Sequence, residues 1–103
     1  MKMDKILKQA QRMQAQMTLA QEELERAVVE GTAGGGAVKI TANGQGDITA
    51  VKIDKEVVTP DDVEMLEDLI LSAIKDAAGK ARELSNSKMN SVTGGMGGFP
   101  GLM

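Results

Sequence analysis

Residues Val28–Asp54 read VVEGTAGGGAVKITANGQGDITAVKID and contain the strongest β-sheet signals of the chain. In its centre, valine, isoleucine and alanine alternate with lysine and threonine, which is the period of a strand with one buried face. Glycine-rich segments separate this centre from β-branched residues on either side. We therefore predict a three-stranded antiparallel meander with strands at Val28–Thr32, Ala37–Ala42 and Asp47–Asp54.

The turns and the register of this meander follow from a few residues. Gly34–Gly36 supplies the first turn. Asn43-Gly44 is typical of a two-residue type I′ hairpin turn, whose central residues need positive φ, although Gln45-Gly46 allows a longer loop. In the last strand, Ile48 falls on the opposite face from Val51. This indicates either a β-bulge or a sheet covered on both sides, and we favour the bulge.

One long helix is predicted from Met3 to about Ala27. The segment has no glycine or proline, and its apolar residues recur every seven positions in two registers. These positions are Met3, Ala10, Met17 and Leu24 in one register and Ile6, Met13, Ala20 and Ala27 in the other. A helix about 36 Å long exceeds what a small domain covers. The stripe therefore requires a partner helix from the same chain or from a second copy.

A second long helix is predicted to begin at Thr59-Pro60. Threonine is a good N-cap, proline is favoured at the first helical position, and acidic residues follow against the positive end of the helix dipole. Apolar residues then keep helical spacing, and Gly79 would mark a kink or a close helix contact. We predict one α-β-β-β-α domain over residues 1–92 and a disordered Gly/Met-rich tail over residues 93–103.

Composition excludes most enzyme classes. The chain of 103 residues has no Cys and no His, which removes thiolate chemistry, zinc-thiolate sites and the commonest general base. No EF-hand spacing or phosphate-loop pattern occurs. We expect no catalytic, cofactor-binding or metal site and no small-molecule substrate. Because no apolar run could span a membrane and no signal-peptide pattern is present, we expect a cytoplasmic protein without a membrane partner.

Charge is distributed in blocks, although the net charge is only −3. Residues 1–15 carry a net charge of +3, residues 16–30 carry −3, residues 60–78 carry −5 and residues 79–103 carry +2. If the two long helices pack antiparallel, their basic ends meet, and the acidic segments meet at the other end. The basic residues of these ends are Lys2, Lys5, Lys8 and Arg12, then Lys80, Arg82 and Lys88.

These basic ends have two interpretations. In a symmetric dimer each would appear twice, so that two positive prongs could straddle the phosphates of DNA. Alternatively, they are ordinary solvated faces that follow the preferences of the helix dipole.

The sequence resembles the YbaB/EbfC family of bacterial nucleoid-associated DNA-binding proteins. The matching segments span almost the whole chain in the same order of elements. They are Leu7–Gln14 (LKQAQRMQ), Val38–Gly44 (VKITANG), Val51–Asp54 (VKID), Glu64–Ile70 (EMLEDLI) and Asp76–Ala78 (DAA).

This resemblance implies an α+β homodimer with a joint central sheet and projecting helical arms. It also implies binding of double-stranded DNA near the arm tips, a place in the nucleoid, and roles in nucleoid organisation and gene regulation. Carried onto this sequence, the DNA-binding candidates are the seven basic residues of the two helix ends. The alternative function is a coiled-coil dimeric adaptor that binds another protein, with weak or no DNA binding.

Overall fold

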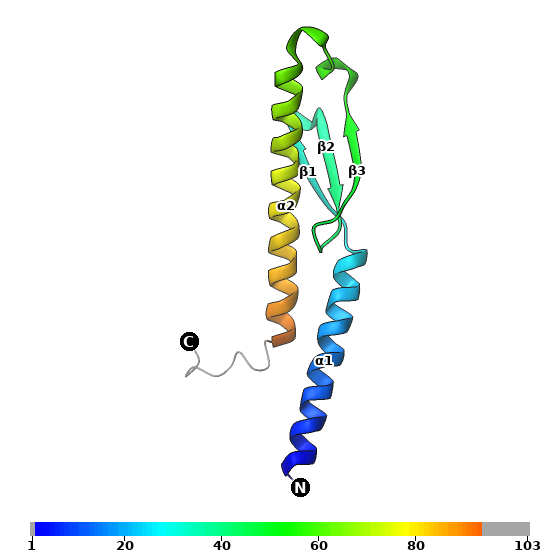
Figure 1. Ribbon diagram of the computed structural model, residues 1–103, viewed down its shortest axis with the longest axis vertical. Coiled ribbons are helices and arrows are strands. Elements are labelled where there is room, and N and C mark those ends of the chain that lie inside the picture. The colour runs from blue at the N-terminus through cyan, green and yellow to red at the C-terminus, as the bar shows by residue number, and fades with distance from the viewer. Residues whose placement is uncertain (1, 94–103) are drawn as a thin grey trace, which may run out of the picture.

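The computed structural model describes residues 2–93 and has the predicted α+β architecture: an N-terminal helix, a three-stranded antiparallel sheet and a C-terminal helix (Figure 1). The molecule is long and thin, at 73 × 26 × 16 Å. Its helices are α1 (Lys2–Arg26) and α2 (Val63–Thr93), its strands are β1 (Val29–Ala33), β2 (Val38–Ala42) and β3 (Ile48–Ile53), and 3₁₀ turns occupy Gly34–Gly36, Lys55–Val57 and Pro60–Asp62. The tail expected beyond α2 lies outside the described residues.

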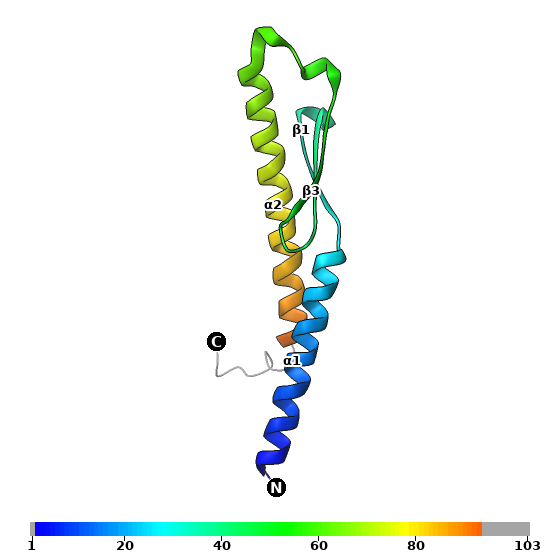
Figure 2. The same cartoon turned by 45° about the vertical axis from the view of Figure 1, so that its right-hand side comes forward.

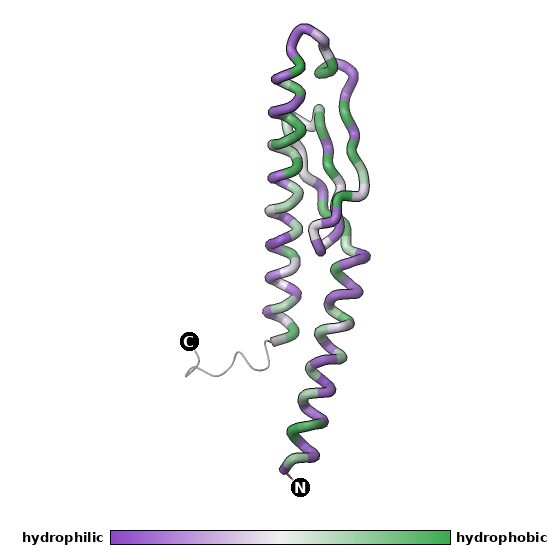
Figure 3. The backbone as a smooth tube through the Cα atoms, viewed as in Figure 1, coloured by the Kyte–Doolittle hydropathy of each residue, from purple (hydrophilic) through white to green (hydrophobic). Residues whose placement is uncertain are grey.

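The core lies between α2 and one face of the sheet. Val38 and Ile40 of β2 are fully buried there, and they pack with Ala73 and Ala77 of α2. Small residues allow this close packing, because a Cβ at Gly31 of β1 would lie 2.3 Å from the backbone oxygen of Ala73. The opposite face of the sheet is not covered by either helix (Figure 2). Hydrophobic residues concentrate in α2 and the strands, whereas hydrophilic residues predominate along α1 (Figure 3).

The predicted bulge is present, but the two-residue turn at Asn43-Gly44 does not form. Thr41 pairs with Ala50 and the next residue pairs with Ile48, which leaves Thr49 as the extra residue of β3. Neither residue of Asn43-Gly44 has positive φ; the left-handed residue is Gly46, at φ 91°. The longer loop therefore forms. The Asn43 side-chain oxygen stabilises it by accepting the N–H groups of Gln45 and Asp47, both at 3.0 Å.

Gly44 serves a different purpose from the one its position predicted. Its N–H donates to the Leu24 carbonyl at 2.7 Å. A Cβ at this position would lie 2.8 Å from Leu24 Cδ2. Glycine is therefore required by the close approach of the hairpin loop to the end of α1, and not by turn geometry.

The second helix begins later than predicted. Thr59 precedes a 3₁₀ turn at Pro60–Asp62, and its side chain makes no capping hydrogen bond. Asp62 Oδ1 instead accepts the N–H of Met65 at 3.1 Å, so Asp62 caps α2. The close contact suggested for Gly79 is not found within residues 2–93, since no atom lies within 4 Å of a Cβ built there.

The two helices run antiparallel but are offset along their axes (Figure 1). Because β1 follows α1 almost directly and the sheet packs on α2, α1 meets only the C-terminal part of α2. Ala20 and Leu24 of α1 are buried, whereas Met3 and Ile6 are exposed. The expected meeting of two basic ends is therefore wrong. The acidic half of α1 lies beside the end of α2, and the basic start of α1 projects past it.

Candidate nucleic-acid interface

The most strongly basic surface is the start of α1, which we call the arm tip and define as residues 2–12. Lys2, Lys5, Lys8 and Arg12 lie on it and are exposed. Their spacing of three and four residues places them along one side of the helix. Within residues 2–93, none of these four cations forms an ion pair. They therefore remain available to an external anion.

Two further features make the arm tip electropositive. Asp4 is the single acidic residue among residues 2–12, so the net charge of the tip is +3. The helix dipole adds a partial positive charge at the same end, equivalent to about half an elementary charge. Among residues 2–93, the tip also projects beyond the end of α2 (Figure 1), which leaves its surface accessible to a large ligand.

The three basic residues predicted in α2 lie elsewhere and are not brought together with the tip. Lys88 forms an ion pair with Glu23 of α1. Within this ion pair Lys88 Nζ donates a hydrogen bond to Glu23 Oε2. The hydrogen bond and the positive charge of Lys88 lower the pKa of the Glu23 carboxyl. Arg82 is exposed beside the hairpin loop, in a shallow groove that Gly44 and Gln45 also line. The predicted DNA-binding residues thus fall into two groups. The four on α1 are exposed and have no ion-pair partner within residues 2–93, whereas Lys80 and Lys88 on α2 pair with other residues of the chain.

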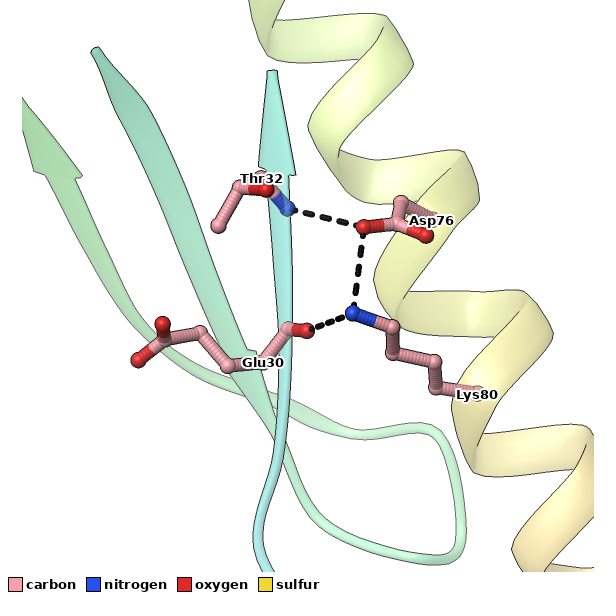
Figure 4. Close-up of polar contacts among 4 residues, drawn as sticks. All are labelled: Glu30, Thr32, Asp76 and Lys80. Atoms are coloured by element: carbon pink, nitrogen blue, oxygen red, sulfur yellow. Dashed lines mark hydrogen bonds and ion pairs between the residues drawn. The ribbon is translucent and has the colours of Figure 1, made fainter. Parts of the chain in front are cut away.

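Lys80 and Asp76 bind the outer edge of β1 (Figure 4). Lys80 Nζ donates to the Glu30 carbonyl at 2.9 Å, and the N–H of Thr32 donates to Asp76 Oδ2 at 3.0 Å. The two side chains also pair with each other at 3.4 Å. The hydrogen bond from Thr32 and the proximity of Lys80 lower the pKa of Asp76. Lys80 therefore has a structural role in this chain.

A second basic pair, absent from the predicted set, lies on the uncovered face of the sheet. Lys39 of β2 and Lys52 of β3 are directly opposite each other in the register, and both are exposed. Like charges in this position repel. The alternation of β2 already assigned Lys39 to this face, but its partner could be found only once the bulge had fixed the register of β3.

Other kinds of site find no support in the described part of the chain. No group of three or more potential metal-ligating side chains comes together within residues 2–93. No helix among the same residues is long and apolar enough to cross a membrane.

The fold and the exposed cations place this chain in the class of small, elongated α+β proteins that carry a projecting basic helix. The particular family follows from comparison: the chain matches the model of the YbaB/EbfC DNA-binding family over residues 1–96 and belongs to this family. The resemblance stated from the sequence is thereby confirmed.

Similar proteins agree with this assignment. A nucleoid-associated protein of Ruminiclostridium cellulolyticum is 53% identical over 100 residues, which cover 97% of this chain and 87% of that protein. A nucleoid-associated protein of Rhodococcus opacus is 49% identical over 102 residues, covering 97% and 90%. The crystal structure of an uncharacterized protein, HP0035, from Helicobacter pylori has the same fold, with a TM-score of 0.76 at 22% identity, over 89% of this chain and 98% of that one.

Proposed function

We propose that this chain is a nucleoid-associated protein that binds double-stranded DNA as a homodimer through its arm tips. The observation that carries the proposal is the set of four exposed cations on a projecting helix, without ion-pair partners within residues 2–93. Lysine and arginine bind phosphates chiefly by charge and release condensed counterions when they do so. The binding is therefore electrostatic, and base sequence enters only through DNA shape and the spacing of the two tips.

The proposed role needs no catalysis. The family is described as DNA-binding, and the sequence lacks His and Cys. Bound along DNA, the dimer would organise the nucleoid, where its relatives' names place them. The family resemblance also implies a role in gene regulation, which we include in the proposal.

The two edges of the sheet support a particular mode of dimerisation. The outer edge of β1 is occupied by Asp76 and Lys80, whose side chains take the place of a neighbouring strand. β3 is the opposite edge of the three-stranded sheet and has no neighbouring strand on its outer side within residues 2–93. It also exposes the apolar side chains of Ile48 and Val51. We therefore propose that two copies join through β3 into one central sheet.

Fluorescence anisotropy tests the proposal. A labelled duplex of about 30 base pairs, roughly 100 Å at 3.4 Å per pair, exceeds the 73 Å length of the chain. It is titrated at several salt concentrations with the natural protein and with the variant Lys5→Glu, Lys8→Glu, Arg12→Glu. We expect the natural protein to bind with a steep dependence on salt. The variant should lose binding while keeping its helicity and its dimeric state.

The variant Arg26→Glu, Lys55→Glu, Lys75→Glu is the matched control. It carries the same change of net charge at three exposed basic residues outside both the arm tip and the strands. If both variants lose binding equally, net charge and not the arm tip explains the interaction. If the natural protein does not bind even at low salt, the DNA mechanism is wrong, and a protein-binding adaptor becomes the better account.

A further inference from the structure

The arm tip carries an uncovered apolar stripe in addition to its cations. Met3, Ile6 and Leu7 are 75%, 64% and 55% exposed. Met3 and Ile6 continue the seven-residue repeat that buries Ala20 and Leu24 further along the helix. α2 covers this repeat near the sheet and ends before it reaches the tip (Figure 1). The apolar repeat that contacts α2 therefore continues along α1 as an exposed stripe. Its seven-residue spacing is that of helices that pair in coiled coils.

The stripe and the cations occupy different sides of α1. With 3.6 residues per turn, the line through Lys5, Lys8 and Arg12 lies about 160° around the helix from the line through Met3 and Ile6. A duplex that contacts the cations therefore leaves the apolar stripe open to solvent. The arm tip can hold DNA on one side and a second helix on another.

We propose that this stripe pairs with the same stripe of a second copy when both copies are bound to DNA, so that DNA binding is cooperative between neighbouring dimers. The inference rests on the proposed function. A second copy fits because it supplies a helix with the identical apolar spacing, as a heptad seam requires.

Charge explains why the pairing depends on DNA. Each tip carries +3 over residues 2–12, so two free tips repel each other. Phosphates beside the cations neutralise this charge. DNA also raises the local concentration of neighbouring tips, which favours a contact too weak to form in free solution.

The experiment compares short and long DNA. One duplex of about 20 base pairs, at 3.4 Å per pair, matches the 73 Å length of the chain; another is several times longer. The test variant is Met3→Gln, Ile6→Gln, Leu7→Gln, which removes the apolar stripe with a good helix former. We expect its Hill coefficient on the long duplex to fall to about 1, whereas that of the natural protein stays above this value. On the short duplex, sized for one dimer, both proteins should give a Hill coefficient of about 1.

Two further variants serve as controls for the glutamine variant. Ile6→Leu with Leu7→Met preserves the apolar stripe and should keep cooperativity, which excludes an effect of substitution as such. A chain that ends at Thr93 should also stay cooperative. Loss of cooperativity in that chain would overturn the proposal, because the contact between copies would then need residues 94–103 and not the apolar stripe alone.

The remaining outcomes separate this inference from the proposed function. Cooperativity that survives the glutamine variant overturns the pairing of tips and leaves DNA binding intact. Failure of the natural protein to bind the short duplex overturns the proposed function itself. If the protein associates through its tips at low salt without DNA, tip pairing does not depend on DNA, and that part of the proposal is wrong.

Discussion

Asp76 of α2 accepts the backbone N–H of Thr32 of β1 at 3.0 Å, so a helix side chain occupies the position where the carbonyl of a fourth strand would lie. Lys80, one turn later, supplies the matching donor at 2.9 Å from the Glu30 carbonyl. An ion pair thus closes one edge of the sheet, in the way that natural sheets block unwanted pairing.

Removal of the Asp76 carboxylate should open this edge. We expect Asp76→Ala to lower the midpoint of thermal unfolding and to produce assemblies larger than the natural one, because the N–H of Thr32 loses its acceptor. Asp76→Asn keeps an acceptor oxygen and should stay close to the natural protein in size. Circular dichroism and size-exclusion chromatography with light scattering measure both effects. An unchanged size distribution for Asp76→Ala would show that the edge is protected by other means.

Acid should weaken the fold through two carboxylates. The pKa values of Glu23 and Asp76 lie below their ordinary values of 4.5 and 3.8. A lowered carboxyl pKa contributes stability that is fully present above the ordinary pKa and is lost as the pH falls through the lower folded-state value. We therefore expect a constant melting temperature from neutral pH to about pH 5 and a decline below about pH 4.

The double variant Glu23→Gln, Asp76→Asn is the control for this acid effect. It should decline less steeply in thermal melts recorded over the same pH range. An equal decline would assign the acid effect to other carboxylates.

Two glycines should respond in opposite directions to alanine. A Cβ at Gly31 would lie 2.3 Å from both Ala73 O and Ala77 N, and backbone atoms cannot yield. We expect Gly31→Ala to destabilise the fold by about 3 kcal/mol. Gly79→Ala meets no atom within 4 Å, and it should stabilise α2 by about 1 kcal/mol. Urea unfolding measures both; a destabilised Gly79→Ala would indicate that a second copy packs closely against α2 there.

Dimerisation through β3 should be sensitive to charge at Val51. Val51 is 54% exposed in the single chain, and the proposed joint sheet would cover it. We expect Val51→Lys to give a monomer by light scattering, because burial of an unpaired ammonium is costly. Leu71→Lys, at a residue 51% exposed on α2, should remain dimeric. A dimeric Val51→Lys protein would move the interface away from β3.

The elements of the fold could be predicted from local signals, but their exact placement could not. Alternation in β2 and the heptad stripe of α1 are properties of neighbouring residues, and both predicted the right element. The turn at Asn43-Gly44 failed because Gly44 responds to Leu24, a residue 20 positions away in the sequence. Likewise, Thr59 has the composition of a cap, yet Asp62 performs the capping. Local preference did not distinguish two good caps three residues apart.

The predicted DNA-binding residues show the same difference between features set by neighbouring residues and features set by tertiary packing. The spacing of Lys5, Lys8 and Arg12 correctly indicated one side of a helix, because helical geometry is local. Lys80 and Lys88 were grouped with them by charge alone. Their engagement by Glu30, Asp76 and Glu23 depends on how the sheet and α1 pack on α2. The role of the seven basic residues in DNA binding stays a prediction.

The offset between the helices has a dynamic consequence. Past the end of α2, the first turns of α1 are held chiefly by their own backbone hydrogen bonds, and a short isolated helix is marginally stable in water. These turns should open far more often than the strands do, so their amide protons should exchange with solvent first. A ligand lying along the tip would then slow exchange at Lys5 and Lys8 long before it altered exchange at Ile40.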